Sequence, residues 1–224
     1  AAYAAIEVGH LISGKTPVDI IVTPLATIAV GAVIAFITGP YINTFTGWLG
    51  TLITINVEAH PFIGGIIVSA LMGIFLTLPI SSAAIGVVLG LDGLAAGAAT
   101  IGCCCQMIGF AVMSYRENKM GGLISQGIGT SMLQMGNIVK NPRIWIAPIL
   151  TSAITGPLAT CLFKLQMNGT PVSSGMGTCG LVGQIGVYTG WVSDVMNGTK
   201  AAITAFDWAG LILICFVLPA ILSF

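Results

Sequence analysis

The stretch GLDGLAAGAATIGCCCQMIGFAVMSYREN, residues 90–118, carries no charged residue between Asp92 and Arg116. A helix that crosses a membrane needs roughly 20 largely apolar residues, and residues 94–114 supply them. A transmembrane β-barrel would instead alternate apolar and polar side chains in segments of about ten residues. Because this run is continuously apolar, it predicts a membrane-spanning α-helix.

Charge is scarce along the whole chain as well as in this stretch. Its 224 residues include seven basic and seven acidic side chains, 6% of the total, and the mean hydropathy is +1.02. A soluble domain carries about 25% charged residues, so these few could not cover a soluble fold. A nucleic-acid partner is excluded, since it would require a basic patch. The composition predicts an all-α polytopic membrane protein embedded in a lipid bilayer.

Other charge-free gaps predict further helices. The predicted spans are residues 18–38 with a kink at Pro24, 61–78, 144–163 and 208–224. A turn is expected at Gly39-Pro40. Residues 41–57 would then form either a tilted helix or a helix lying along the membrane surface.

Thirty glycines and ten prolines indicate that some of these helices are short, broken or closely packed. Residues 121–137 and 173–192 contain too much glycine and serine for a helix that faces lipid. Irregular backbone at membrane depth is tolerated only where protein or water covers it. Both stretches are therefore predicted to be re-entrant, although the first could also lie on the membrane.

The two ends of the sequence suggest a piece of a longer protein. The chain begins with Ala1 in an Ala-rich helical stretch, and residues 211–224 are apolar to the last position. We expect a single transmembrane domain over residues 1–224 that lacks N-terminal helices.

Glu58 and His60 are the first pair of candidate site residues. They are isolated ionisable side chains next to Pro61, where a predicted span begins. An ionisable residue at membrane depth is costly and suggests a functional site, and a histidine beside a glutamate can bind a substrate hydroxyl or carry a proton. The alternative is that both side chains lie in water at a segment end.

The remaining candidates are mostly uncharged. Ser81 and Ser82 follow a helix-breaking proline, and Asp92 either binds solute hydroxyls or caps the next helix. Side-chain amides offer a donor and an acceptor together, which suits a neutral polyol or sugar; the alternative is that they only link helices. The amides predicted to bind substrate are Gln106, Gln134, Asn137 and Gln184. The six cysteines form no CxxC pair, so no metal site and no cofactor is predicted.

Long strings of the sequence resemble one family of membrane proteins. They are VDIIVTPLATI (18–28), LTLPISSAAIG (76–86), residues 90–118 as quoted above, GGLISQGIGTSMLQMGNIVKNPRIWIAP (121–148) and GMGTCGLVGQIG (175–186). They resemble the family related to the perfringolysin O regulator, which is classed with the membrane (IIC) components of the bacterial sugar phosphotransferase system. The resemblance implies a multi-pass protein of the bacterial inner membrane, a homodimer with re-entrant hairpins, and a His and a Glu near the sugar.

The leading functional hypothesis is therefore a transporter of the phosphotransferase IIC type that moves a small, sugar-like polar solute. Phosphorylation would need separate carrier proteins, so the chain itself is expected to transport rather than to act as an enzyme. The alternative is a membrane sensor that binds a small ligand and controls gene expression through a partner. A third hypothesis is a channel-like pore.

Overall fold

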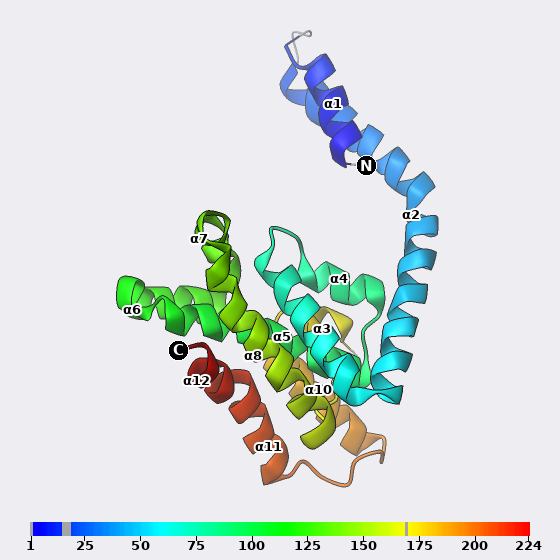
Figure 1. The fold of residues 1–224 in the computed structure, drawn as a ribbon. Coiled ribbons are helices and arrows are strands. Elements are labelled where there is room, and N and C mark those ends of the chain that lie inside the picture. Colours follow the sequence, from blue (N-terminus) through cyan, green and yellow to red (C-terminus); the bar gives the residue numbers. More distant parts are fainter. Residues whose placement is uncertain (1, 15–18, 169) are drawn as a thin grey trace. The chain divides into compact units, whose positions relative to one another are not determined.

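The structure is a computed structural model that describes residues 2–14, 19–168 and 170–224. The described residues form helices and the coils between them, with no strand. The chain divides into two compact units, residues 1–48 and 49–224, and Figure 1 colours them along the sequence. The all-α fold predicted from composition is confirmed.

The first unit contains α1 (Ala2–Ile12) and the first part of α2 (Asp19–Ala59). Gly9 of α1 lies against Thr27 of α2, and a β-carbon there would collide with the threonine side chain. The helix predicted at 18–38 is present from Asp19, while Val18 lies outside the described residues.

The turn predicted at Gly39-Pro40 is wrong, because α2 continues through both residues. Pro40 has no N–H to donate to the carbonyl four residues earlier, so α2 loses one helical hydrogen bond there. Thr38 Oγ1 donates to the Ile34 carbonyl at 2.8 Å, and Thr44 Oγ1 donates to the Pro40 carbonyl at 2.9 Å. The apolar sequence on both sides of the proline then continues the helix.

The second unit is built around α5 (Gly93–Met113), the helix predicted from the opening stretch. Most of its residues are buried, and the side chains of Cys103, Cys104 and Cys105 are fully so. Its glycines admit neighbouring backbones, as small residues do in membrane helix packing: a β-carbon on Gly102 would strike the backbone of Ser69 in α3 (Pro61–Thr77).

Contacts along α5 fix the direction of its neighbours. α3 runs parallel to it, because Ser69 lies beside Gly102 and Thr77 beside Gln106. α8 (Ile146–Pro157) runs antiparallel to α3, and Ser69 Oγ donates to the Ser152 carbonyl at 2.7 Å. We call the two ends of this bundle the Asp92 end and the Ser114 end, after the residues that flank α5.

The remaining helices of the second unit are shorter or irregular. α4 (Ser82–Leu89) follows α3, and a π-helical turn, η4 (Leu158–Leu162), extends α8. The C-terminal run from the Asp92 end to the Ser114 end comprises α11 (Ala205–Ile212), η6 (Leu213–Val217) and α12 (Leu218–Ser223). Among the described residues, the helical segments long and apolar enough to cross a membrane are Ile21–Ala59, Gly93–Met113, Pro142–Leu162 and Ala205–Ser223, and α3 is a shorter apolar helix.

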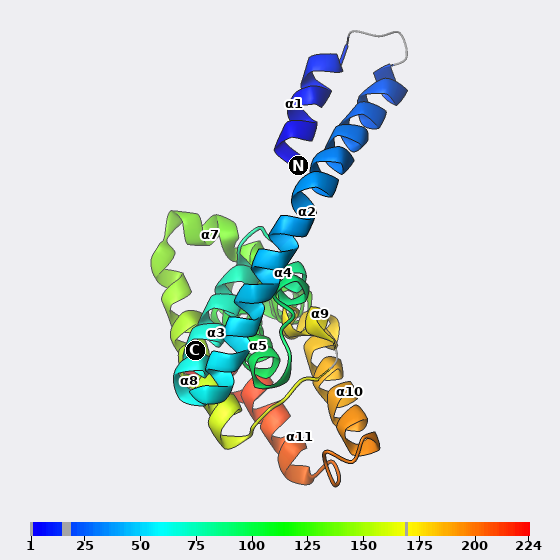
Figure 2. The same cartoon turned by 90° about the vertical axis from the view of Figure 1, so that its right-hand side faces the viewer.

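The first glycine-rich stretch belongs to a broken segment that starts and finishes at the Ser114 end. It comprises α6 (Tyr115–Ile124), η1 (Ser125–Gly129), η2 (Ser131–Gln134), α7 (Met135–Lys140) and η3 (Pro142–Trp145). At η1 it lies alongside α5, where a β-carbon on Gly127 would touch Ala111 and Ile108. Figure 2 shows α7 leading back towards α8.

The second glycine-rich stretch belongs to a broken segment that starts and finishes at the Asp92 end. A coil leads to α9 (Pro171–Ser174), η5 (Cys179–Leu181) and α10 (Val182–Met196). Asn168 Nδ2 ties the two arms together by donating to both carboxylate oxygens of Asp194 at 2.9 Å. The re-entrant stretch predicted over residues 173–192 is irregular only in its first half, because the second half belongs to the regular helix α10.

Candidate functional site

Gln106 lies at the centre of a buried polar cluster between α3, α5, η2 and η3. Its side chain is fully buried, and its Oε1 accepts hydrogen bonds from Thr77 Oγ1 at 3.2 Å and Trp145 Nε1 at 3.0 Å. Thr77 Oγ1 also lies 3.0 Å from Ser131 Oγ. The Nε2 atom of Gln106 has no hydrogen-bond partner among the residues that the structure describes. A buried polar group without a partner is rare and calls for an explanation, such as a ligand or an unseen water molecule.

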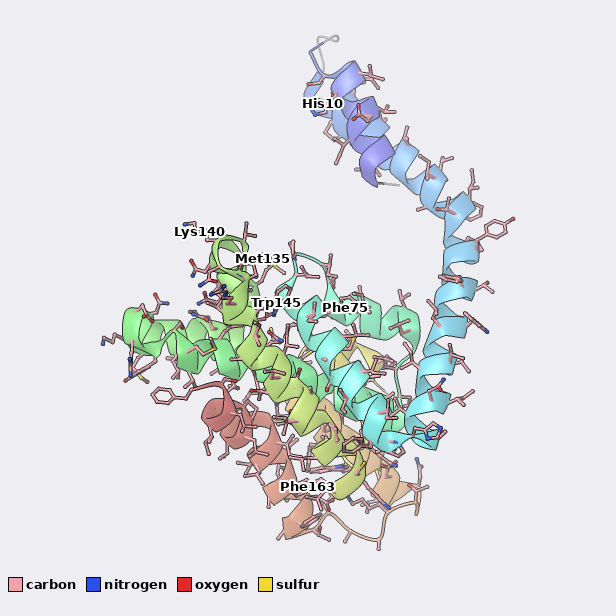
Figure 3. The ribbon with its side chains drawn as sticks, viewed as in Figure 1. His10, Phe75, Met135, Lys140, Trp145 and Phe163 are labelled. Atoms are coloured by element: carbon pink, nitrogen blue, oxygen red, sulfur yellow. The ribbon has the colours of Figure 1, made fainter. Side chains whose placement is uncertain are left out.

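A second group of side chains forms a hydrogen-bonded row, which we call the amide chain. Gln126 Nε2 donates to Ser114 Oγ at 2.8 Å, Gln134 Nε2 donates to Gln126 Oε1 at 2.9 Å, and Asn137 Nδ2 donates to Gln134 Oε1 at 2.8 Å. Ser131 and Gln134 are the first and last residues of η2. This short helix therefore joins the Gln106 cluster to the amide chain, and Figure 3 labels Trp145 and Met135 in this region.

Two adjoining hollows of about 400 and 430 Å³ lie beside the amide chain. Their volumes are within the range of small-molecule sites. Both are lined by Asn118, Gln134 and Asn137, and the only charged side chain on their walls is that of Glu117. The walls run from exposed side chains such as Asn118 to the nearly buried Gln126 and Gln134. This arrangement offers both donors and acceptors to a solute with hydroxyl groups.

The two broken segments meet alongside α5. Thr178 is fully buried, and its Oγ1 donates to the Gly127 carbonyl at 2.6 Å. The same hydroxyl lies 3.5 Å from Met107 Sδ. Gly177 has a positive φ of 55°, and a β-carbon there would collide with Cys103 and Cys104. The segments thus enter from opposite ends of the bundle and touch near the middle of α5.

Three of the predicted substrate-binding residues, Gln106, Gln134 and Asn137, are brought into this region. Gln184 belongs to α10 and contacts α5 away from this region: its Nε2 donates to Cys104 Sγ at 3.2 Å, and its buried Oε1 has no partner among the described residues. Ser81 caps α4 by accepting a hydrogen bond from the Ala84 N–H at 3.2 Å. Ser82 is buried and donates to the Gly175 carbonyl at 2.6 Å, which joins α4 to the second broken segment.

Glu58, His60 and Asp92 are not brought to the amide chain. All three are exposed at the Asp92 end, whereas Thr77 is at the other end of α3, a helix of 17 residues and hence about 25 Å long. Asp92 occupies the N-cap position of α5, but its side chain makes no capping hydrogen bond. These residues therefore do not form one site with Gln106.

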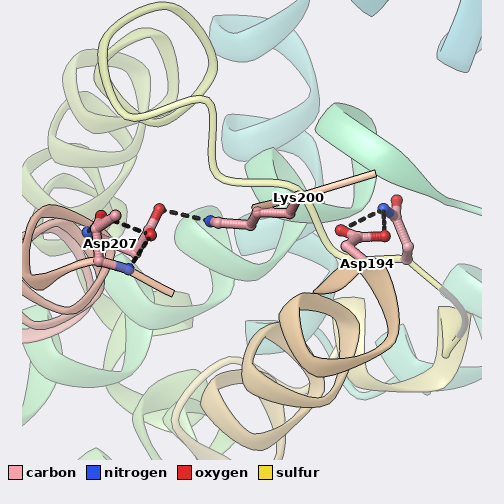
Figure 4. A network of polar contacts seen from close by, with 5 residues as sticks. Asp194, Lys200 and Asp207 are labelled. Atoms are coloured by element: carbon pink, nitrogen blue, oxygen red, sulfur yellow. Dashed lines mark hydrogen bonds and ion pairs between the residues drawn. The ribbon is translucent and has the colours of Figure 1, made fainter. Parts of the chain in front are cut away.

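The Asp92 end has its own polar hollow of about 300 Å³. Figure 4 shows its contacts: Lys200 Nζ lies 2.7 Å from Asp207 Oδ1, and Asn168 contacts Asp194. Lys200 also lies 4.9 Å from the ring centre of Trp191. Among the described residues, no three His, Cys, Asp or Glu side chains gather in a way that could hold a metal ion.

Several residues of the site were not singled out from the sequence. They are Thr77, Ser114, Ser131, Trp145 and Thr178. Single hydroxyl groups in apolar helices commonly bond to their own helix backbone, so their sequence pattern does not identify a site. The available signal was their position: Thr77 directly precedes the Leu78-Pro79 break, and Ser131 and Thr178 lie inside the two glycine-rich stretches.

Comparison with known proteins supports the broader part of the resemblance. The family model described as "Phosphotransferase system, EIIC" matches residues 1–224. No curated protein and no solved structure matches the chain, so the narrower likeness to the perfringolysin O regulator stays a prediction. Because the family model matches the whole chain, this protein belongs to the phosphotransferase-system EIIC family of membrane transporter components.

Proposed function

We propose that this EIIC protein moves a small neutral solute with several hydroxyl groups, such as a sugar, across the bacterial inner membrane. The amide chain and the Gln106 cluster would bind the solute. The observation that carries the proposal is a buried network of amides and hydroxyls beside two hollows, with one unused donor, Gln106 Nε2.

The chemistry of the network favours a neutral solute over an ion. Burying an ion without a compensating charge is far more costly than burying a hydroxyl group that finds hydrogen bonds. Glu117 is the charged side chain on these walls, and it lies at the exposed rim. Amides pair with hydroxyl groups as both donor and acceptor, so the site is suited to a polyol.

The family membership supports further parts of the proposal. The two broken segments would be re-entrant in the membrane, each returning to the side from which it came. Soluble carrier proteins would supply the phosphoryl group, and the chain would work as a homodimer. The homodimer is tested by cross-linking the purified protein in lipid and measuring the mass of the product, which should be twice that of the single chain.

Uptake into proteoliposomes tests the function. The purified chain is reconstituted and given radiolabelled monosaccharides and polyols, with and without phosphotransferase carrier proteins and phosphoenolpyruvate. We expect accumulation of one solute class, as its phosphate ester when the carriers are present. Binding without any flux would support the membrane sensor instead, and neither binding nor flux for any neutral solute would contradict the proposal.

A further inference from the structure

The charges of the second unit are divided unequally between its two ends. The Ser114 end carries Arg116, Lys119, Lys140 and Arg143 and one acidic residue, Glu117, a net charge of +3. The Asp92 end carries two lysines, Lys164 and Lys200, and four acidic residues, a net charge of −2; the acidic residues are Glu58, Asp92, Asp194 and Asp207. No other residue of the second unit is Asp, Glu, Lys or Arg.

Among the described residues, the basic side chains at the Ser114 end form no ion pair within the protein. All four are exposed, and the ion pair found among the described residues joins Lys200 to Asp207 at the other end. An excess of Lys and Arg in short loops next to membrane helices marks the cytoplasmic side. Arg116 and Lys119 lie within six residues after the end of α5, and Lys140 and Arg143 lie within six residues before the start of α8, so all four are in the range where this rule applies.

We propose that the Ser114 end faces the cytoplasm and that this conformation opens the hollows of the amide chain to the cytoplasm only. Their use as a solute site rests on the proposed function, whereas the side on which they open does not. The exposed rim includes Glu117 and Asn118, which stand between Arg116 and Lys119 in α6, and Asn137, which precedes Lys140 in α7. A charged rim belongs in water and not against lipid tails.

The path towards the Asp92 end is closed in this conformation. Thr178 Oγ1 bonds to the Gly127 carbonyl where the two broken segments touch. Gly177 lies against the backbone of Cys103 and Cys104, and Gly183 packs on the Gly177 carbonyl. The contacts at Gly177 and Gly183 involve backbone atoms, so the rotation of a side chain alone does not remove them. A solute in the hollows would therefore exchange with the Ser114 side.

Labelling with a membrane-impermeant maleimide tests the sidedness. The starting protein carries Cys161→Ser and Cys179→Ala, which leaves the four fully buried cysteines, Cys103, Cys104, Cys105 and Cys215. Asn118→Cys then probes the rim of the hollows, and Gln166→Cys probes the exposed surface of the Asp92 end as its matched control. The full-length chain is expressed in a bacterial host, and both variants are labelled in spheroplasts and in inverted membrane vesicles.

We expect Asn118→Cys to react in inverted vesicles and Gln166→Cys in spheroplasts, each at least tenfold faster than from the opposite side. Reaction of Asn118→Cys from outside would overturn the orientation. Reaction of both cysteines from the same side, or no reaction of Asn118→Cys from either, would overturn the open cytoplasmic hollow. Solutes found in the uptake screen should slow the labelling of Asn118→Cys. If the two variants react from the expected sides but no solute slows the reaction, the proposed solute site is contradicted and the orientation is still supported.

Discussion

Gln106 shows how one amide can be held rigidly and still keep a free binding group. Its carbonyl oxygen accepts hydrogen bonds from Thr77, the last residue of α3, and from Trp145, the last residue of η3. Its NH₂ group has no protein partner, although it is fully enclosed. A donor that is already oriented and desolvated can bind a hydroxyl group with little further loss of entropy.

Replacement of Gln106 by leucine should weaken solute binding at least about tenfold, a loss of about 1.4 kcal/mol or more. The same change leaves Trp145 Nε1 without its acceptor, whereas Thr77 Oγ1 keeps the Gly73 carbonyl and Ser131 Oγ as partners. The free energy of unfolding should therefore fall by about 1–3 kcal/mol. Binding to the detergent-purified protein and its thermal unfolding measure the two effects. Gln166→Leu makes the same chemical change at an exposed position and should alter neither; equal effects of both variants would contradict this role of Gln106.

Thr178→Val should destabilise the protein by about 1–3 kcal/mol, because valine keeps the shape of threonine but leaves the Gly127 carbonyl unsatisfied. Thermal unfolding in detergent measures the loss. Thr189→Val is the control, since this exposed hydroxyl bonds only to the Gly186 carbonyl of its own helix, and we expect a change within about 0.5 kcal/mol. If Thr178→Val is as stable as the control, the contact between the segments is unimportant.

At the scale of elements, two broken segments approach the same stretch of α5 from opposite ends. The first uses a π-helical turn and two 3-10 turns, and the second uses a short helix and a 3-10 turn. Such irregular turns leave backbone groups free to bond outside their own helix, as Gly127 does with Thr178. At some positions only glycine lets a neighbouring backbone approach this closely, whereas at others a larger side chain would fit.

Gly102→Ala and Gly136→Ala should therefore have opposite effects on stability. A β-carbon at Gly102 strikes the backbone of Ser69, so α3 and α5 must separate and we expect a loss of more than about 2 kcal/mol. Gly136 has nothing within 4 Å of that position and lies in α7, so alanine should add up to about 1 kcal/mol. Thermal unfolding compares the two variants, and a Gly102→Ala protein as stable as the unmodified chain would refute the packing of α3 on α5.

The helices could be predicted from the sequence where a long run without charged residues marks them. The charge-free run from Asp92 to Arg116 predicted α5 almost to the residue. The turn at Gly39-Pro40 was wrong, because a proline ends a helix reliably in water but less so in apolar surroundings. The regular helix α10 was not predicted, because residues 173–192 contain so much glycine and serine; within that helix Gly186 packs on Ser173 and Gly190 on Asn168.

At the scale of the whole molecule, the second unit combines an uncharged interior with oppositely charged ends. The type of site residue was predictable, since amides in apolar surroundings are costly unless they pair with other groups. Which amides gather could not be predicted, because only the tertiary fold brings Gln134 to Gln126 and Gln184 to Cys104. Glu58 and His60 were plausible by their chemistry, but they lie at the opposite end of α3 from Thr77.

The affinity for the solute should change less than about twofold between about 50 and 500 mM NaCl. The distance over which salt screens charges falls from about 14 Å to about 4 Å in this range, and a neutral solute among amides makes no charge–charge interaction that would be weakened. Isothermal titration with the solute identified by uptake measures the affinity. A drop of severalfold would indicate instead an anionic solute held by the basic rim.

The uncharged character of the Gln106 cluster and the amide chain has an electrical consequence. No side chain in this group carries a formal charge. A neutral solute that moves along these amides therefore carries no charge across the membrane. The resting potential, worth about 2.3 kcal/mol per elementary charge at 100 mV, would neither drive nor oppose that movement. Transport through this protein should then be electrically silent, and its direction would be decided by what happens to the cargo after it arrives.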